Sequence, residues 1–276
     1  MKTSWGKPVH VIPFCRTLLV TLSVAVCLVT LMGCGNSPEK DASPAAYIET
    51  MRKAAEAGDA DAQYDLGLMY AVGVNGVPKN AAESMKWYRK AAEQGLAGAQ
   101  FLLGMMYYEG NGVPQDYAEA AKWYRKAAEQ GDDIAQYFLG LMYAYGEGVP
   151  VDYAEAIKWC RKAAEQGNAK AQYNLGAMYA AGMGVPEDFA KAAKWYRKAA
   201  EQGHAKAQLE LGLIYYDGKG VPEDNVAAYA WWSVAATSGD DDARKYRDSL
   251  KRELTPSQVD RGQLMAREIF ERIMKR

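Results

Sequence analysis

The chain has 276 residues, of which 49% are hydrophobic and 24% are charged, and its formal net charge is −1. This composition is typical of a folded protein and excludes a wholly disordered chain. The near-neutral charge also argues against nucleic acid as a partner, because proteins that neutralise phosphates usually carry a basic excess. With 2 histidines and 4 cysteines, the chain has few residues for metal binding or nucleophilic catalysis.

The first segment in chain order, residues 1–33, carries three basic and no acidic side chains and contains an apolar run from 17 to 32. It ends in Leu-Met-Gly before Cys34. This pattern resembles the signal sequence of a bacterial lipoprotein, which implies cleavage before Cys34 and acylation of its thiol and its new amino group. An uncleaved membrane anchor is the alternative, although the apolar run is shorter than the ~20 residues that cross a bilayer.

The lipoprotein interpretation places the chain in the bacterial cell envelope. Gly35 stands where an aspartate commonly retains such proteins in the inner membrane, so the resemblance favours the outer membrane, with the protein facing the periplasm. Removing residues 1–33 changes the net charge to −4 and leaves His204 and Cys160 as the histidine and the non-lipidated cysteine. Residues 34–45, rich in Gly, Ser, Pro and charge, are predicted to form a flexible tether.

A 36-residue period dominates the rest of the chain. The sequence Trp-Tyr-Arg-Lys-Ala-Ala-Glu-Gln-Gly recurs with the same spacing, and one copy has Cys160 in place of tyrosine. The copies begin at Trp87, Trp123, Trp159 and Trp195, and a degenerate copy begins at Trp231. Self-similarity at a fixed period of this length predicts an array of stacked units rather than a single core.

Each unit is predicted to be two helices. In the first helix Ala99, Leu103 and Met106 fall at i, i+4 and i+7, which places them on one helical stripe. Gly110 suits the end of that helix, because glycine adopts left-handed backbone geometry readily. Asp116 then suits the N-cap of the second helix.

The units are predicted to span residues 59–239, between capping helices. Residues 46–58 resemble a lone second helix and are predicted to cap the N-terminal end. Residues 240–276 are predicted to form C-terminal capping helices, and Thr255 to Gln258 has the form of a capping box. The apolar face of the last helix is predicted to contain Val259, Ala266, Ile269, Phe270 and Ile273.

A glycine recurs inside the first helix of every unit, as in Gly104 and Gly140. Glycine in a helix interior costs ~1 kcal/mol relative to alanine. A cost repeated in every unit predicts a repeated cause, namely close approach by a neighbouring helix. The tryptophan ring of the second helix is predicted to occupy the place where a side chain would be.

The repeated motif Ala-x-x-x-Leu-Gly-x-x-Tyr, followed by Trp-Tyr-Arg-Lys-Ala-Ala-Glu-Gln-Gly, resembles the Sel1-like repeat, a relative of the tetratricopeptide repeat. The resemblance covers about two thirds of the chain. It implies an all-α fold, a right-handed α/α superhelical solenoid with a concave groove lined by the first helices. It also implies an adaptor that binds a protein or peptide partner.

Comparison of the units separates structural positions from variable ones. Four positions per first helix, spaced 4, 3 and 4 residues apart, lie on one face opposite the Ala-Leu-Met stripe. Charged residues occupy this face in the outer units and apolar or aromatic residues in the middle ones. The predicted centre of a binding groove is Leu102, Met105, Ile134, Phe138, Leu141 and Tyr145. Exposed apolar patches are candidate binding sites. Equally, neighbouring helices could cover these six side chains, which would make them part of the core.

The remaining candidates for chemistry favour structural interpretations. We predict no catalytic residue, no metal site and no cofactor. His204 occupies a turn between units and is predicted to be a surface residue, whereas Cys160 is predicted to fill core or groove volume. The recurring Gly-x-Gly lacks a preceding strand and a following Lys-Ser/Thr pair, so it predicts a turn rather than a phosphate loop. Residues 243–276 carry a net charge of +5, which indicates a solvated capping helix or contact with an anionic envelope component.

These observations predict a lipid-anchored, non-enzymatic scaffold in the envelope. A rival comes from a cysteine-rich branch of the same family, which has been linked to β-lactam binding and hydrolysis. Its repeats each contain a disulfide, and the matching positions here are alanines, for example Ala92 and Ala99. A mainly structural envelope spacer is a third alternative. The sequence does not define an oligomeric state.

Overall fold

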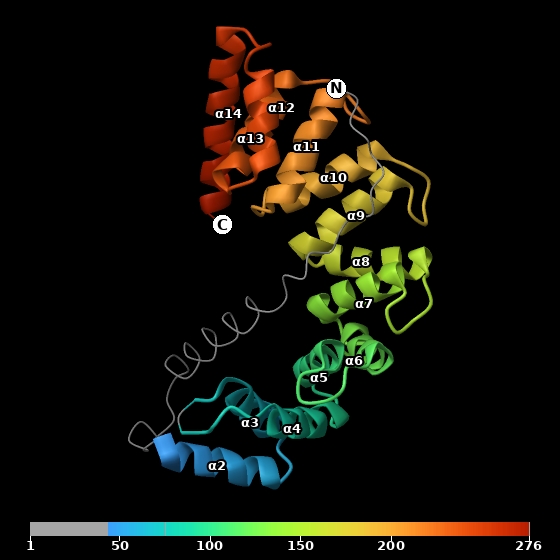
Figure 1. The fold of residues 1–276 in the computed structure, drawn as a ribbon, viewed down its shortest axis with the longest axis vertical. Coiled ribbons are helices and arrows are strands. Elements are labelled where there is room, and N and C mark those ends of the chain that lie inside the picture. The colour runs from blue at the N-terminus through green and yellow to red at the C-terminus, as the bar shows by residue number, and fades with distance from the viewer. Residues whose placement is uncertain (1–43, 75, 276) are drawn as a thin grey trace. The chain divides into compact units, whose positions relative to one another are not determined.

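The computed structural model describes residues 44–74 and 76–275, and all regular secondary structure within them is α-helical. The predicted signal peptide, Cys34 and most of the tether lie outside these residues. The helices, in chain order, are α2 (Pro44–Glu56), α3 (Ala60–Val72), α4 (Ala81–Glu93), α5 (Ala97–Glu109), α6 (Tyr117–Glu129), α7 (Asp133–Tyr145), α8 (Tyr153–Glu165), α9 (Ala169–Ala181), α10 (Phe189–Ala200), α11 (Ala205–Asp217), α12 (Asn225–Thr237), α13 (Asp241–Leu250) and α14 (Pro256–Met274) (Figure 1).

The helices pack in sequential pairs. In each pair a first helix packs against the second helix that follows it: α3 with α4, α5 with α6, α7 with α8, α9 with α10, and α11 with α12. This arrangement confirms the predicted all-helical repeat fold. The chain divides into two compact units. Unit 1 ends at Gln130 and contains α2 to α6, and unit 2 begins at Gly131 and contains α7 to α14.

The helix ends follow the predicted local signals. The side chain of Asp116 accepts a hydrogen bond from the Glu119 amide at 3.0 Å and so caps α6. Helix α5 ends at Gly110, whose φ of 70° is left-handed. At the start of α14, Thr255 and Gln258 form the predicted reciprocal capping box, with proline in the first turn. These caps satisfy backbone groups that a helix leaves without partners.

The N-terminal end of unit 1 is closed by α2, which packs on α3. Ala55 of α2 is fully buried in a cluster that includes Leu66 of α3 and Trp87 of α4. Tyr47, Ile48 and Met51 pack against the same cluster. The terminal repeat of a solenoid would otherwise expose an apolar face, so α2 acts as a cap.

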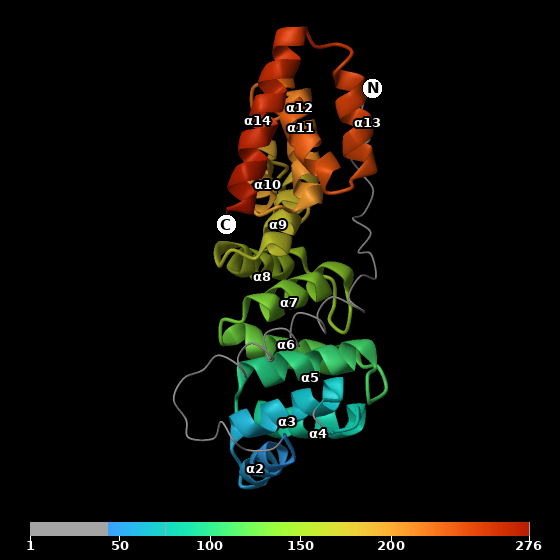
Figure 2. The ribbon, with the colours of Figure 1, turned by 90° about the vertical axis from the view of Figure 1, so that its left-hand side faces the viewer.

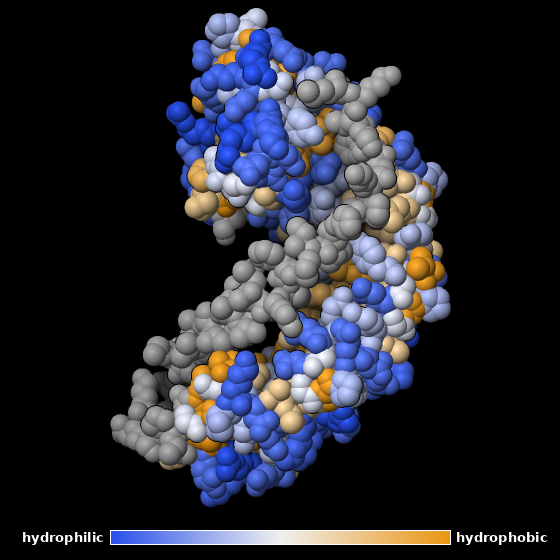
Figure 3. Space-filling view, viewed as in Figure 1, coloured by the Kyte–Doolittle hydropathy of each residue, from blue (hydrophilic) through white to orange (hydrophobic). Residues whose placement is uncertain are grey.

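The C-terminal end of unit 2 is closed by α13 and α14, which both pack on α12 (Figure 2). Ile269 of α14 is buried, and the ring of Tyr229 lies where a side chain on Gly262 would be, 2.6 Å from an added Cβ. Phe270 was predicted to join this buried face, but its side chain is 42% exposed. The buried stripe is therefore narrower than predicted and centres on Gly262 and Ile269. Figure 3 shows mostly hydrophilic residues over this end of unit 2.

The glycines inside the first helices lie against a side chain of the second helix, but that side chain is not the repeat tryptophan: it is a tyrosine in three repeats, Cys160 in the third and Trp232 in the last. A Cβ added at Gly104 would lie 2.8 Å from Cδ1 of Tyr124, the residue after the repeat tryptophan. Only in the last repeat is the ring a tryptophan, Trp232, and it stands at the tyrosine position. The repeat tryptophans lie instead beside lysines of their own helix, with Lys126 Nζ 3.9 Å from the ring centroid of Trp123.

Consecutive repeats are connected by glutamine side chains, for which the sequence had suggested no role. The buried side chain of Gln172 donates to the Ala164 carbonyl at 3.0 Å and accepts from Gln202 Nε2 at 2.7 Å. Gln202 also donates to the Gly167 carbonyl at 2.9 Å. The buried position is glutamine in all five repeats: Gln63, Gln100, Gln136, Gln172 and Gln208. We call this set, with its partners, the glutamine ladder.

Candidate binding face

The residues predicted to centre the groove divide between the two units. Leu102 and Met105 belong to α5 of unit 1 and are both half-buried. Leu102 packs against the core cluster that contains Leu103 and Met106. Intramolecular packing therefore covers part of this side chain, which was the alternative that the sequence left open.

In unit 2 the predicted residues lie along α7. Ile134, Phe138 and Leu141 are half-buried, and Tyr145, in the last turn, is 41% exposed. The stripe formed by Ala135, Leu139 and Met142 on the same helix is fully buried. Helix α7 thus has a core stripe and a second, accessible apolar stripe. We call the latter, together with the equivalent positions of α9 and α11, the unit 2 face.

The equivalent positions of α9 and α11 carry different chemistry. On α9 they are Lys170, Asn174, Ala177 and Ala181, and on α11 they are Lys206, Glu210, Leu213 and Asp217. Leu213 is buried, and Asp217 forms an ion pair with Lys219 at 3.1 Å. The unit 2 face therefore changes from aromatic and apolar on α7 to polar and charged on α11.

His204 and Tyr173 form a contact that the sequence did not reveal. His204 is in the predicted turn, but it caps α11 by accepting a hydrogen bond from the Ala207 amide at Nδ1, at 3.2 Å. Its ring stacks on Tyr173 with centroids 4.7 Å apart, so it is half-buried rather than a surface residue. Burial, assisted by the nearby charge of Lys170, lowers the pKa of His204 to about 4. The imidazole is neutral at pH 7 and can act as the cap acceptor.

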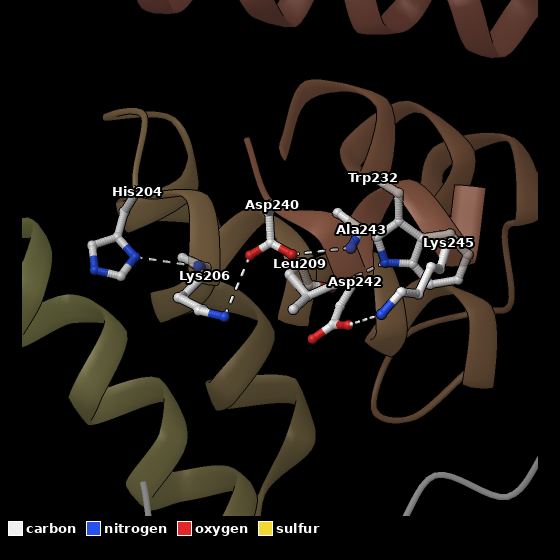
Figure 4. A network of polar contacts seen from close by, with 9 residues as sticks. His204, Lys206, Leu209, Trp232, Asp240, Asp242, Ala243 and Lys245 are labelled. Atoms are coloured by element: carbon white, nitrogen blue, oxygen red, sulfur yellow. Dashed lines mark hydrogen bonds and ion pairs between the residues drawn. The ribbon is translucent and has the colours of Figure 1, made fainter. Parts of the chain in front are cut away.

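Polar contacts connect the start of α11 with the start of α13 (Figure 4). Asp240 accepts a hydrogen bond from the Ala243 amide at 3.0 Å and pairs with Lys206 Nζ at 3.4 Å. Glu210 lies one turn after Lys206 on α11. Burial raises the pKa of its carboxyl group to about 7; the charge of Lys206 opposes this rise and that of Asp240 adds to it. A carboxyl group of this pKa changes charge near neutral pH.

Cys160 is a free, buried cysteine, as the sequence predicted. Burial raises the pKa of its thiol to about 12. Because the thiolate is the nucleophilic form, this thiol is poorly suited to covalent chemistry at neutral pH. Within the described residues, there is no cluster of three or more His, Cys, Asp or Glu able to hold a metal ion. Over the same part of the chain, every helix is too short or too polar to cross a membrane.

Paired helices of 12 or 13 residues, joined by a hydrogen-bonded glutamine ladder, define an α-helical repeat protein. The chain belongs to the Sel1 repeat family, whose model matches residues 60–96, 97–132, 133–168, 169–204 and 205–240. A comparison of the chain with curated proteins found no match.

Two solved structures resemble the chain over most of its length. A protective antigen present in uropathogenic Escherichia coli strains, which displays an SLR fold, is 40% identical with a TM-score of 0.74 and covers 83% of this chain. This chain spans about half of that protein, 48% of its length. A Sel1 repeat protein from Oxalobacter formigenes is 36% identical with a TM-score of 0.64, and the match covers 80% of this chain and 99% of the other.

Proposed function

We propose that this Sel1 repeat protein is a binding scaffold that holds a protein or peptide partner on the unit 2 face without catalysing a reaction. We further propose that it is anchored by lipid on Cys34 in the bacterial cell envelope, at the outer membrane and facing the periplasm. The family is one of helical repeats, whose extended surfaces suit the binding of peptide segments.

One observation carries the proposal of a binding face. Helix α7 buries one apolar stripe in the core and leaves a second one, with Ile134, Phe138 and Tyr145, accessible to solvent. Soluble proteins rarely keep neighbouring large apolar side chains accessible without a role in binding. Aromatic anchors of this kind contribute much of the energy of protein interfaces.

We expect Phe138→Ala to weaken partner binding by about tenfold or more, because truncating an aromatic anchor costs ~1–2 kcal/mol or more. The measurement is quantitative crosslinking in intact cells followed by purification of the full chain. Phe270→Ala is the control, since Phe270 is a more exposed phenylalanine on α14, a helix that does not contribute to this face. Equal capture by Phe138→Ala and the wild type would contradict the assignment of the face.

The lipid anchor has an independent test. We expect labelled palmitate to be incorporated into the wild-type chain and not into Cys34→Ser, because the resemblance assigns acylation to that cysteine. Cys160→Ser is the control and should retain the label, since its thiol is buried. Label that persists in Cys34→Ser would show that the anchor is elsewhere.

A further inference from the structure

Helix α2 joins α3 through the same contact by which a second helix joins the next repeat. Gln63 of α3 donates to the Ala55 carbonyl of α2 at 2.9 Å. In the following repeat Gln100 of α5 donates to the Ala92 carbonyl of α4 at 3.1 Å. The sequences agree, because α2 contains Met-Arg-Lys-Ala-Ala-Glu where α4 contains Tyr-Arg-Lys-Ala-Ala-Glu. Helix α2 is therefore the second helix of an additional, incomplete repeat.

The first helix of this additional repeat is missing. In the five complete repeats each second helix also packs against the first helix of its own repeat. Among the described residues, which begin at Pro44, α2 packs on α3 and has no first helix of its own. Residues 1–43 do not contain the Leu-Gly pair that occurs in all five first helices. The sequence before α2 thus lacks the motif of a first helix.

The stripe that faces the first helix in a complete repeat is accessible on α2. Met51 and Ala54 of α2 occupy the repeat positions of Tyr88 and Ala91 in α4. In all five complete repeats these two positions are at most 3% exposed, whereas Met51 and Ala54 are only half-buried. Tyr47, one turn before Met51, extends the stripe and is also half-buried. An apolar stripe that a helix covers in five repeats is therefore open in the sixth.

The complete repeats show which kind of helix fits this stripe. In each of them the glycine of the first helix lies against the residue equivalent to Met51. A Cβ added at Gly176, for example, would lie 2.7 Å from the ring of Tyr196. The leucine before this glycine is fully buried in all five repeats. A fitting helix therefore has leucine on its apolar face, followed by glycine, which permits close approach of the two backbones.

We propose that the open stripe of α2, formed by Tyr47, Met51 and Ala54, binds an amphipathic helix of a partner protein with the first-helix pattern Ala-x-x-x-Leu-Gly. The bound helix completes the additional repeat and continues the interface that already joins the two helices of every other repeat. A second copy of this chain does not offer such a helix, because a second helix already covers each of its five first helices. The stripe belongs to unit 1, so the proposal does not depend on the unit 2 face.

The probe is the synthetic peptide of residues 168–182, which contains α9 with its N-cap Asn168 and its C-cap Gly182. A fluorescently labelled peptide is titrated with the full chain, and binding is followed by fluorescence anisotropy. The control peptide carries Gly176→Leu, which keeps the apolar face but fills the place of the close approach. We expect the control peptide to bind at least tenfold more weakly, although it is the more hydrophobic of the two.

Two variants of the full chain locate the bound peptide. Ala54→Lys places a charge on the stripe and should weaken peptide binding at least tenfold. It should fold, because the position is partly exposed and lysine can extend its ammonium group into water. Glu56→Lys is the matched control, since it changes the charge of an exposed residue on another side of the same helix and should bind like the wild type.

The wild-type chain provides a measurement that needs no substitution for its readout. With ¹³C-methyl methionine, the methyl resonance of Met51 is assigned from its loss in Met51→Leu. We expect this resonance to shift with the peptide of residues 168–182 and to stay in place with the Gly176→Leu peptide.

Three results would count against the proposal. Equal binding of the two peptides, or a Met51 resonance that does not shift, would overturn it. Binding that is lost in Phe138→Ala but kept in Ala54→Lys would place the peptide on the unit 2 face instead. A full chain that is dimeric by itself, and monomeric as Ala54→Lys, would show that a second copy covers the stripe in place of a partner helix.

Discussion

Gly140→Leu is expected to lower the free energy of unfolding by about 3 kcal/mol or more, because overpacking a tight helix contact forces backbone shifts. A Cβ at this position would lie 2.6 Å from Cys160 Sγ and 3.2 Å from the carbonyl oxygen of Ala156. The sulfur can rotate away, but the carbonyl belongs to the backbone of α8 and cannot. For a chain of this size the loss corresponds to a fall of about 6–12 °C in the melting temperature.

Gly98→Ala is the matched control for this effect. Gly98 also lies inside a first helix, but an added Cβ would be 3.5 Å from its nearest neighbour, the ring of Tyr64. That is an ordinary contact distance, so alanine should be neutral or stabilise by up to ~1 kcal/mol through helix propensity. The melting temperatures of both variants are measured by circular dichroism. An unchanged melting temperature for Gly140→Leu would contradict the close approach of α7 and α8.

The sequence predicted that the repeat tryptophan faces the glycine of each first helix, whereas the residue one position after it does so. Trp123 and Tyr124 are adjacent in the same helix, and both recur with the 36-residue period. Periodicity therefore cannot distinguish them. The structure places Tyr124 against Gly104, whereas Trp123 is half-buried and lies beside Lys126. Local signals such as the aspartate caps were predictable, because a cap depends only on residues within one turn.

The candidate face shows the same limit. Comparison of repeats found the accessible stripe of α7, since variable positions at helical spacing indicate a surface. It did not find the stacking of His204 on Tyr173, because that contact joins a side chain of α9 to the N-cap residue of α11, far along the chain. The recurrence of Gln172 and its equivalents was visible in the sequence and could have indicated the glutamine ladder.

Gln172→Leu is expected to lower the free energy of unfolding by about 2 kcal/mol, since it removes two hydrogen bonds worth ~1 kcal/mol each from a buried position. The lost bonds are those to the Ala164 carbonyl and from Gln202. Leucine is similar in size, so the change reports the hydrogen bonds more than the packing. The measurement is urea denaturation, with an unchanged slope showing that the unfolded state is unaffected.

The last repeat provides the comparison that isolates the ladder. Gln208 donates to the Ala200 carbonyl at 3.0 Å, but its Oε1 is buried without a hydrogen-bond partner, because Ser238 stands where Gln202 stands one repeat earlier. Gln208→Leu should therefore cost about 1 kcal/mol less than Gln172→Leu. Ser238→Gln should supply the missing donor, stabilise the protein by ~1 kcal/mol and make Gln208→Leu as costly as Gln172→Leu. Equal losses from the two leucine variants in the wild-type background would show that the ladder does not stabilise contacts between repeats.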